Sequence, residues 1–112
     1  MYILSVRIDK EFDLVGINYR HKGRAYLQEA VLFLISKDKN TSEAIIAQIA
    51  ENNKNSYGSV IRAMQTAING AWKNSAIEDL LAHFTAPVSV RTGVPTPTDF
   101  INFYADKIRK SM

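Results

Sequence analysis

Hydrophobic residues recur every three or four positions along most of the chain, which is the spacing of an amphipathic helix. The clearest case lies at about 56–72, where one apolar stripe holds Val60, Met64, Ala67, Ile68 and Ala71. Similar spacing predicts four further helices, at about 25–36, 42–52, 75–84 and 96–110.

The start of the chain allows two interpretations. Every second residue is apolar, as in a strand, at Tyr2, Leu4, Val6 and Ile8. Apolar residues also recur at helical spacing, at Leu4, Ile8, Phe12 and Val15. Gly16 favours a helix that ends near Val15, because glycine accepts the left-handed conformation common at helix ends. A strand remains open for residues 1–8.

Capping residues predict where the later helices begin. Thr41 or Ser42 follows a polar turn at 37–40 and can cap the helix at 42–52, and Asn55 can cap the helix after it. Ser75 and Glu78 have the spacing of a capping box. We expect the short helix that they begin to bury Ile77, Leu80, Leu81 and Phe84.

The last helix has the plainest start. Thr96 can cap it, with Pro97 at its first position and Asp99 in its first turn. The residues predicted to face inward are Phe100, Ile101, Tyr104, Ala105 and Ile108.

The helices at 42–52 and 56–72 are joined by only a few residues, which predicts a helix-turn-helix at about 42–72. Ala50 is small where the two helices approach, and Val60 is expected to point into the same contact. The opposite face of the second helix carries Ser59, Arg62, Thr66 and Asn69, with Gln65 beside them. Hydroxyls, amides and one arginine suit a helix in the DNA major groove. A mildly polar surface helix is the alternative.

The densest positive cluster lies in a loop predicted at 17–24. Its cations Arg20, Lys22 and Arg24 are candidates for contacts with DNA phosphates, together with Lys54 and Lys73; a solvated turn is the alternative.

Composition limits the other possibilities. The 112 residues are enough for one domain, 1–112, and the net charge of +3 permits an anionic partner. The absence of cysteine excludes disulfides, thiol catalysis and zinc fingers, and fits a reducing cytoplasm. No apolar run has the length of a membrane span, and no signal peptide is expected. We find no catalytic motif, metal site or cofactor site, and predict that the chain is not an enzyme.

Between about Val15 and Ile108, a series of residues and short runs follows an order and spacing that can be compared with a known family. Its marks are Gly16, Lys22-Gly23, the run 26–31, Ile49-Ala50, Val60, Arg62-Ala63, Ala67-Ile68, Ala71-Trp72, Ile77, Phe84 and the runs 95–101 and 105–109. In these the chain resembles the C-terminal DNA-binding domain of the sporulation master response regulator, stage 0 sporulation protein A. The resemblance implies an all-α domain of about six helices around a helix-turn-helix. It also implies sequence-specific binding to double-stranded promoter DNA, often as a tandem dimer.

The chain departs from the family at several positions. The family's recognition helix reads Arg-Val-Glu-Arg where this chain has Ser59-Val60-Ile61-Arg62, and Arg-His where it has Gln65-Thr66. Asn53 replaces an apolar residue of the turn. The family's receiver domain is absent, so the chain is a fragment or a stand-alone relative, and Met1 favours the second.

Two functions remain at this point. The first is a DNA-binding transcription regulator with a target of its own, in which Ser59, Arg62, Gln65 and Thr66 contact bases. The second is a protein-interaction module that has lost specific DNA binding and modulates a related regulator, as a homodimer or mixed dimer through the C-terminal helix.

Overall fold

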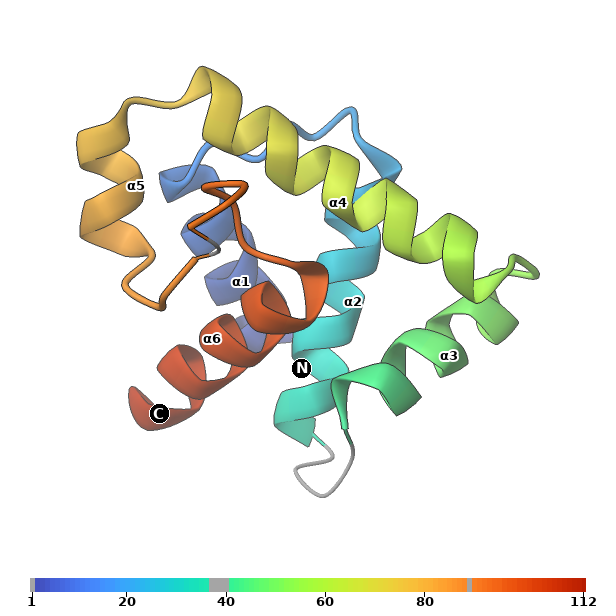
Figure 1. Cartoon of the computed structure of the whole chain (residues 1–112). Helices are drawn as coiled ribbons and strands as arrows, with labels where there is room; N and C mark the ends of the chain where they lie inside the picture. The colour runs from blue at the N-terminus through green and yellow to red at the C-terminus, as the bar shows by residue number, and fades with distance from the viewer. Residues whose placement is uncertain (1, 37–40, 89) are drawn as a thin grey trace.

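The computed structural model describes residues 2–36, 41–88 and 90–112 (Figure 1). Within these ranges the chain forms six helices and no strand: α1 (Tyr2–Leu14), α2 (Lys22–Ser36), α3 (Ser42–Asn52), α4 (Tyr57–Asn74), α5 (Ile77–His83) and α6 (Pro97–Lys110). The predicted all-α fold is therefore confirmed. The polar turn expected at 37–40 lies outside the described residues.

Helix α2 is the centre of the fold. It packs against α1, α3, α4 and α6, and Figure 1 shows α4 lying across one of its ends. The inward side of α2 is fully buried at Leu27, Ala30 and Val31. Because α4 packs on a helix that also contacts α1, α3 and α6, its position depends directly on α2.

From Tyr2 to Leu14 the chain is helical, as favoured, and not a strand. Ile8, Phe12 and Val15 are all buried, and the Phe12 ring meets the rings of Phe100 and Tyr104 edge-on at 5.2 and 5.5 Å between centroids. Gly16 follows with a φ of 77°, the left-handed conformation expected at the helix end.

Two predicted caps are confirmed. The Thr41 hydroxyl accepts a hydrogen bond from the Ala44 amide at 3.2 Å, and the Thr96 hydroxyl accepts one from the Asp99 amide at 3.2 Å. The inward face of α6 is also as predicted, with Phe100, Ile101, Tyr104, Ala105 and Ile108 all buried.

The other two caps are corrected. Ser56, not Asn55, caps α4, and its hydroxyl accepts from the Ser59 amide at 3.1 Å. Ser75 does not cap α5, because the cap position is Ala76; the Ser75 hydroxyl donates to the Val15 carbonyl at 3.0 Å, just after the end of α1. Helix α5 begins after Ala76 without a side-chain cap.

The buried side of α5 is narrower than predicted. Leu80 and Phe84 are buried, but Ile77 and Leu81 are 65% and 68% exposed. A helix of seven residues turns only one side to the core, and within α5 the buried residue on that side is Leu80. Two large apolar side chains therefore lie on the surface.

Candidate nucleic-acid interface

Helices α3 and α4 form the predicted helix-turn-helix. The two helices pack against each other, and Ala50 and Val60, which the sequence predicts at their contact, are both buried. The turn closes because the Asn55 amide donates to the Ala50 carbonyl at 2.9 Å and Lys54 adopts a left-handed φ of 54°. The Asn53 side chain donates to the Ile49 carbonyl at 2.8 Å, which gives a local reason for a polar residue in this turn.

Helix α4 has one buried and one exposed face. The stripe predicted from the sequence is buried, whereas Arg62, Thr66, Asn69 and Lys73 are exposed. At about 100° per residue, these four fall within one narrow sector of the helix. The exposed face is polar, with Arg62 near its start and Lys73 in its last turn.

One edge of this face borders the start of α2. A methyl group built on Gly23 would lie 1.9 Å from the Ala63 carbonyl oxygen, and one built on Gly70 would lie 3.2 Å from His21 Nε2. Arg20 and Lys22, on either side of His21, are both exposed. Two of the predicted phosphate-contacting residues thus lie along the edge of α4 formed by Ala63 and Gly70.

The other edge borders the segment 91–96. The Gln65 side chain donates to the Pro95 carbonyl at 3.1 Å and to Asn69 Oδ1 at 3.0 Å. A hollow of about 880 Å³ lies between the segment and the C-terminal half of α4, and its lining includes Lys73 and Arg91. The sequence predicts no helix between those at about 75–84 and 96–110, and the available signal in this region is Arg91, a cation between Pro87 and Pro95.

Two predicted base-contacting residues have bonds within the protein. Ser59 is half-buried, and its hydroxyl accepts from the Ser56 hydroxyl at 2.9 Å. Gln65 is also half-buried and is held by the two bonds described above. Arg62 and Thr66 are exposed on the central sector of the face.

The prediction for Arg24 is wrong. The loop predicted at 17–24 ends earlier, since α2 begins at Lys22, and the Arg24 side chain turns inward with only 2% exposed. Its guanidinium pairs with Asp9 at 2.7 Å and Asp13 at 2.9 Å, and donates to the Ile17 carbonyl at 2.5 Å. A buried guanidinium with these partners is not available to a phosphate.

The same cluster perturbs a nearby carboxylate. The hydrogen bond from Arg24, supported by one from Gln28, holds the pKa of Asp9 below its usual value against the opposing effect of burial. The guanidinium also stacks on the Tyr19 ring, 3.9 Å from its centroid. The cations of this region therefore divide into a structural one, Arg24, and the exposed Arg20 and Lys22.

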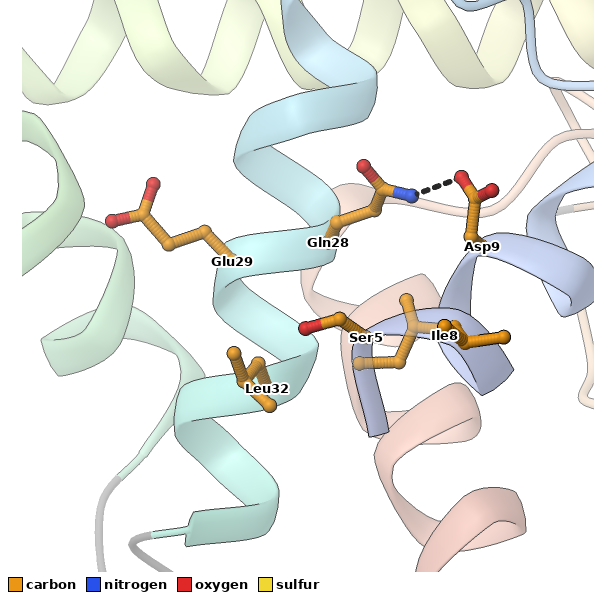
Figure 2. A pocket seen from close by; sticks show the side chains of 7 residues that line it. Ser5, Ile8, Asp9, Gln28, Glu29 and Leu32 are labelled. Carbon is orange, nitrogen blue, oxygen red and sulfur yellow. Dashed lines mark hydrogen bonds between the residues drawn. The ribbon is translucent and has the colours of Figure 1, made fainter. Parts of the chain in front are cut away.

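A second hollow, of about 420 Å³, lies between α1 and α2 (Figure 2). Its lining includes the apolar Ile8 and Leu32. Gln28 donates to Asp9 at 2.8 Å, and Figure 2 marks this bond between α2 and α1. Because Asp9 already pairs with Arg24, we interpret this hollow as the outer side of the structural cluster.

A family model described as "Sporulation initiation factor Spo0A C terminal" matches residues 8–108. The chain belongs to this family. The match runs from the middle of α1 to the last turn of α6 and includes the whole helix-turn-helix. The resemblance found in the sequence is thereby confirmed.

The Spo0A C-terminal family is one of DNA-binding transcription regulatory domains and is not a family of enzymes. Among the residues that the structure describes, no three His, Asp or Glu side chains gather in a way that could hold a metal ion. Over the same ranges, no helix combines the length and the apolar character needed to cross a membrane.

Proposed function

We propose that the chain is a sequence-specific DNA-binding regulator whose helix α4 enters the major groove. The observation that carries the proposal is the exposed face of α4, with Arg62 and Thr66 at its centre and exposed cations beside it. A groove about 12 Å wide admits one α-helix and presents guanine acceptors that suit a bidentate arginine. A DNA-binding function also implies a cytoplasmic location.

We propose roles for several side chains of this surface. Arg62 is proposed to pair with a guanine edge, and Thr66 to make a shorter contact nearby. Ser59 lies in the first turn, where helix-turn-helix proteins contact bases, although its hydroxyl must then share its bond with Ser56. Arg20, Lys22, Lys54 and Lys73 are proposed to contact phosphates, which fix the register of the protein on the duplex.

The target is proposed to differ from that of the family. The chain keeps one arginine where the family's recognition helix has several charged residues, and it places hydroxyl and amide groups at the others. Shorter, neutral side chains read fewer base edges, so specificity then depends more on Arg62.

A protein-interaction module is the second candidate, and the exposed Ile77 and Leu81 favour it. A dimer through α6 would use polar contacts, because that helix buries its main apolar residues and exposes Asn102, Asp106 and Lys110. In this candidate function, the partner is either a second copy of the chain or a related regulator.

Two measurements on one preparation separate the candidates. Fluorescence anisotropy with labelled duplex DNA is expected to show binding that weakens as salt rises. Sedimentation of the chain, alone and mixed with a related regulator, tests the second candidate. Salt-insensitive or absent DNA binding together with a mixed species in sedimentation would favour the interaction module.

A further inference from the structure

The hollow between α4 and the segment 91–96 is a defined part of the surface. The Gln65 side chain ties the segment to α4 through the Pro95 carbonyl, and Pro95 and Pro97 are both buried. Within the segment, the Val94 amide donates to the Thr92 hydroxyl at 3.4 Å and Gly93 takes a left-handed φ of 74°. The segment therefore has a hydrogen bond of its own and is joined to α4 by the bond from Gln65.

The lining of the hollow suits an anion. Two cations, Lys73 and Arg91, contribute to it from opposite walls, and both are exposed. Their neighbours in the lining, Asn69 and Thr92, are neutral and polar, and no acidic residue contributes to it. Because a phosphate needs both charge and hydrogen-bond donors, this combination fits the DNA backbone.

The hollow lies along one edge of the exposed face of α4. At about 100° per residue, Gln65 and Trp72 lie on one edge of the helix, and Ala63 and Gly70 lie on the other. The exposed face with Arg62 lies between the two edges. The first edge borders the segment 91–96, and the second borders Arg20 and Lys22.

We propose that this hollow is a second phosphate-binding site, with Arg91 as its contacting residue and Gln65 as the residue that positions it. This inference rests on the proposed function, since it concerns the same bound duplex. A helix in the major groove has one DNA strand along each edge. Arg20 and Lys22 contact the backbone of one strand, and Arg91 with Lys73 contacts that of the other. Gln65 acts through the segment and does not contact a base.

The first test is the salt dependence of DNA binding by Arg91→Gln. Each lost phosphate contact makes the slope of log K against log salt less negative by about 0.9. The factor by which affinity falls between about 50 and 200 mM salt is then about 3.5-fold smaller. The loss of affinity is expected to be the same on every DNA sequence, because phosphates carry no base information. Lys10→Gln is the matched control: Lys10 is exposed on α1, outside the α4 face and its two flanking segments.

The second test uses Gln65→Leu, alone and combined with Arg91→Gln. If Gln65 positions Arg91, the single variant weakens binding to all sequences, and Arg91→Gln costs less in its presence than in the parent. A change of preference at one base pair would instead show that Gln65 reads a base and would overturn its positioning role.

The outcomes separate this inference from the proposed function. A parent protein that binds DNA with a steep salt slope, while Arg91→Gln matches both the parent and Lys10→Gln, overturns the second phosphate site and leaves the function intact. A parent that shows no salt-dependent binding overturns both. A lowered slope in Arg91→Gln alone supports the site.

Discussion

Gly23 and Ala63 meet backbone to backbone: a methyl group on Gly23 would lie 1.9 Å from the Ala63 carbonyl oxygen. This contact joins the first turn of α2 to the middle of α4. It also holds Lys22, the residue before Gly23, beside the exposed face of α4. The packing of the core and the arrangement of the proposed DNA-binding surface therefore depend on the same close approach.

Gly23→Ala is expected to destabilise the fold, because the new methyl group must push α2 and α4 apart. Overpacking of this kind costs about 1–3 kcal/mol, measured as a lower free energy of unfolding in urea. Gly58→Ala is the control, since nothing lies within 4 Å of the added methyl group and a helical alanine gains up to about 1 kcal/mol. Equal effects of the two substitutions would contradict the contact.

Arg24→Met is expected to reduce stability by about 2–4 kcal/mol, because it leaves two carboxylates without their partner and the Ile17 carbonyl without its donor. Lys22→Met, which removes an exposed cation of the same turn, is expected to change stability by less than about 0.5 kcal/mol. DNA binding is expected to show the reverse: Lys22→Met lowers the steepness of the salt dependence, and Arg24→Met does not. A less steep salt dependence for Arg24→Met, at unchanged stability, would show that Arg24 contacts DNA.

Stability is expected to fall in acid partly through Asp9. Its pKa is lower in the folded chain than the ordinary value of 3.8, so its contribution is present above the unfolded pKa and is lost as pH falls through the folded one. The Asp9 side chain is 39% exposed, which limits the size of the effect. Urea unfolding of the parent and Asp9→Asn between pH 3 and 7 checks this. The two curves should differ most near neutral pH and approach each other as the pH falls below 3.8, the unfolded pKa; a constant difference would exclude this linkage.

Arg62→Ala is expected to weaken binding to the preferred DNA sequence by about 1–3 kcal/mol and to remove discrimination at one base pair. Binding of a panel of duplexes, each altered at one position, measures both effects. Thermal unfolding serves as the control, since Arg62 is exposed and its loss should leave the fold unchanged. If the variant binds every duplex as the parent does, α4 does not read bases through this residue.

The elements that follow from local pattern could be predicted from the sequence. The stripe from Val60 to Ala71, the Thr96 cap and the inward face of α6 all depend on spacing within one helix, and all are as expected. Thr41 and Gly16 act as predicted for the same reason.

Two of the errors come from contacts between distant segments. Ser75 has the spacing of a cap, but the Val15 carbonyl, sixty positions earlier, takes its hydroxyl. Arg24 belongs by sequence to a basic cluster, but Asp9 and Asp13 on α1 bind it in the interior. Arg91 likewise lines a hollow beside α4, at a segment that Gln65 bonds through the Pro95 carbonyl, and no local pattern indicates this.

Selection from a pool of random duplex DNA, followed by a salt titration of the enriched sequence, tests the central claim most directly. We predict an enriched motif with a G·C pair whose replacement weakens the parent but not Arg62→Ala. We also predict a slope of log K against log salt of about −4 to −5, one contact each for Arg20, Lys22, Lys54, Lys73 and Arg91. No enrichment, with binding that salt barely changes, would contradict the assignment of α4 as a DNA-reading helix.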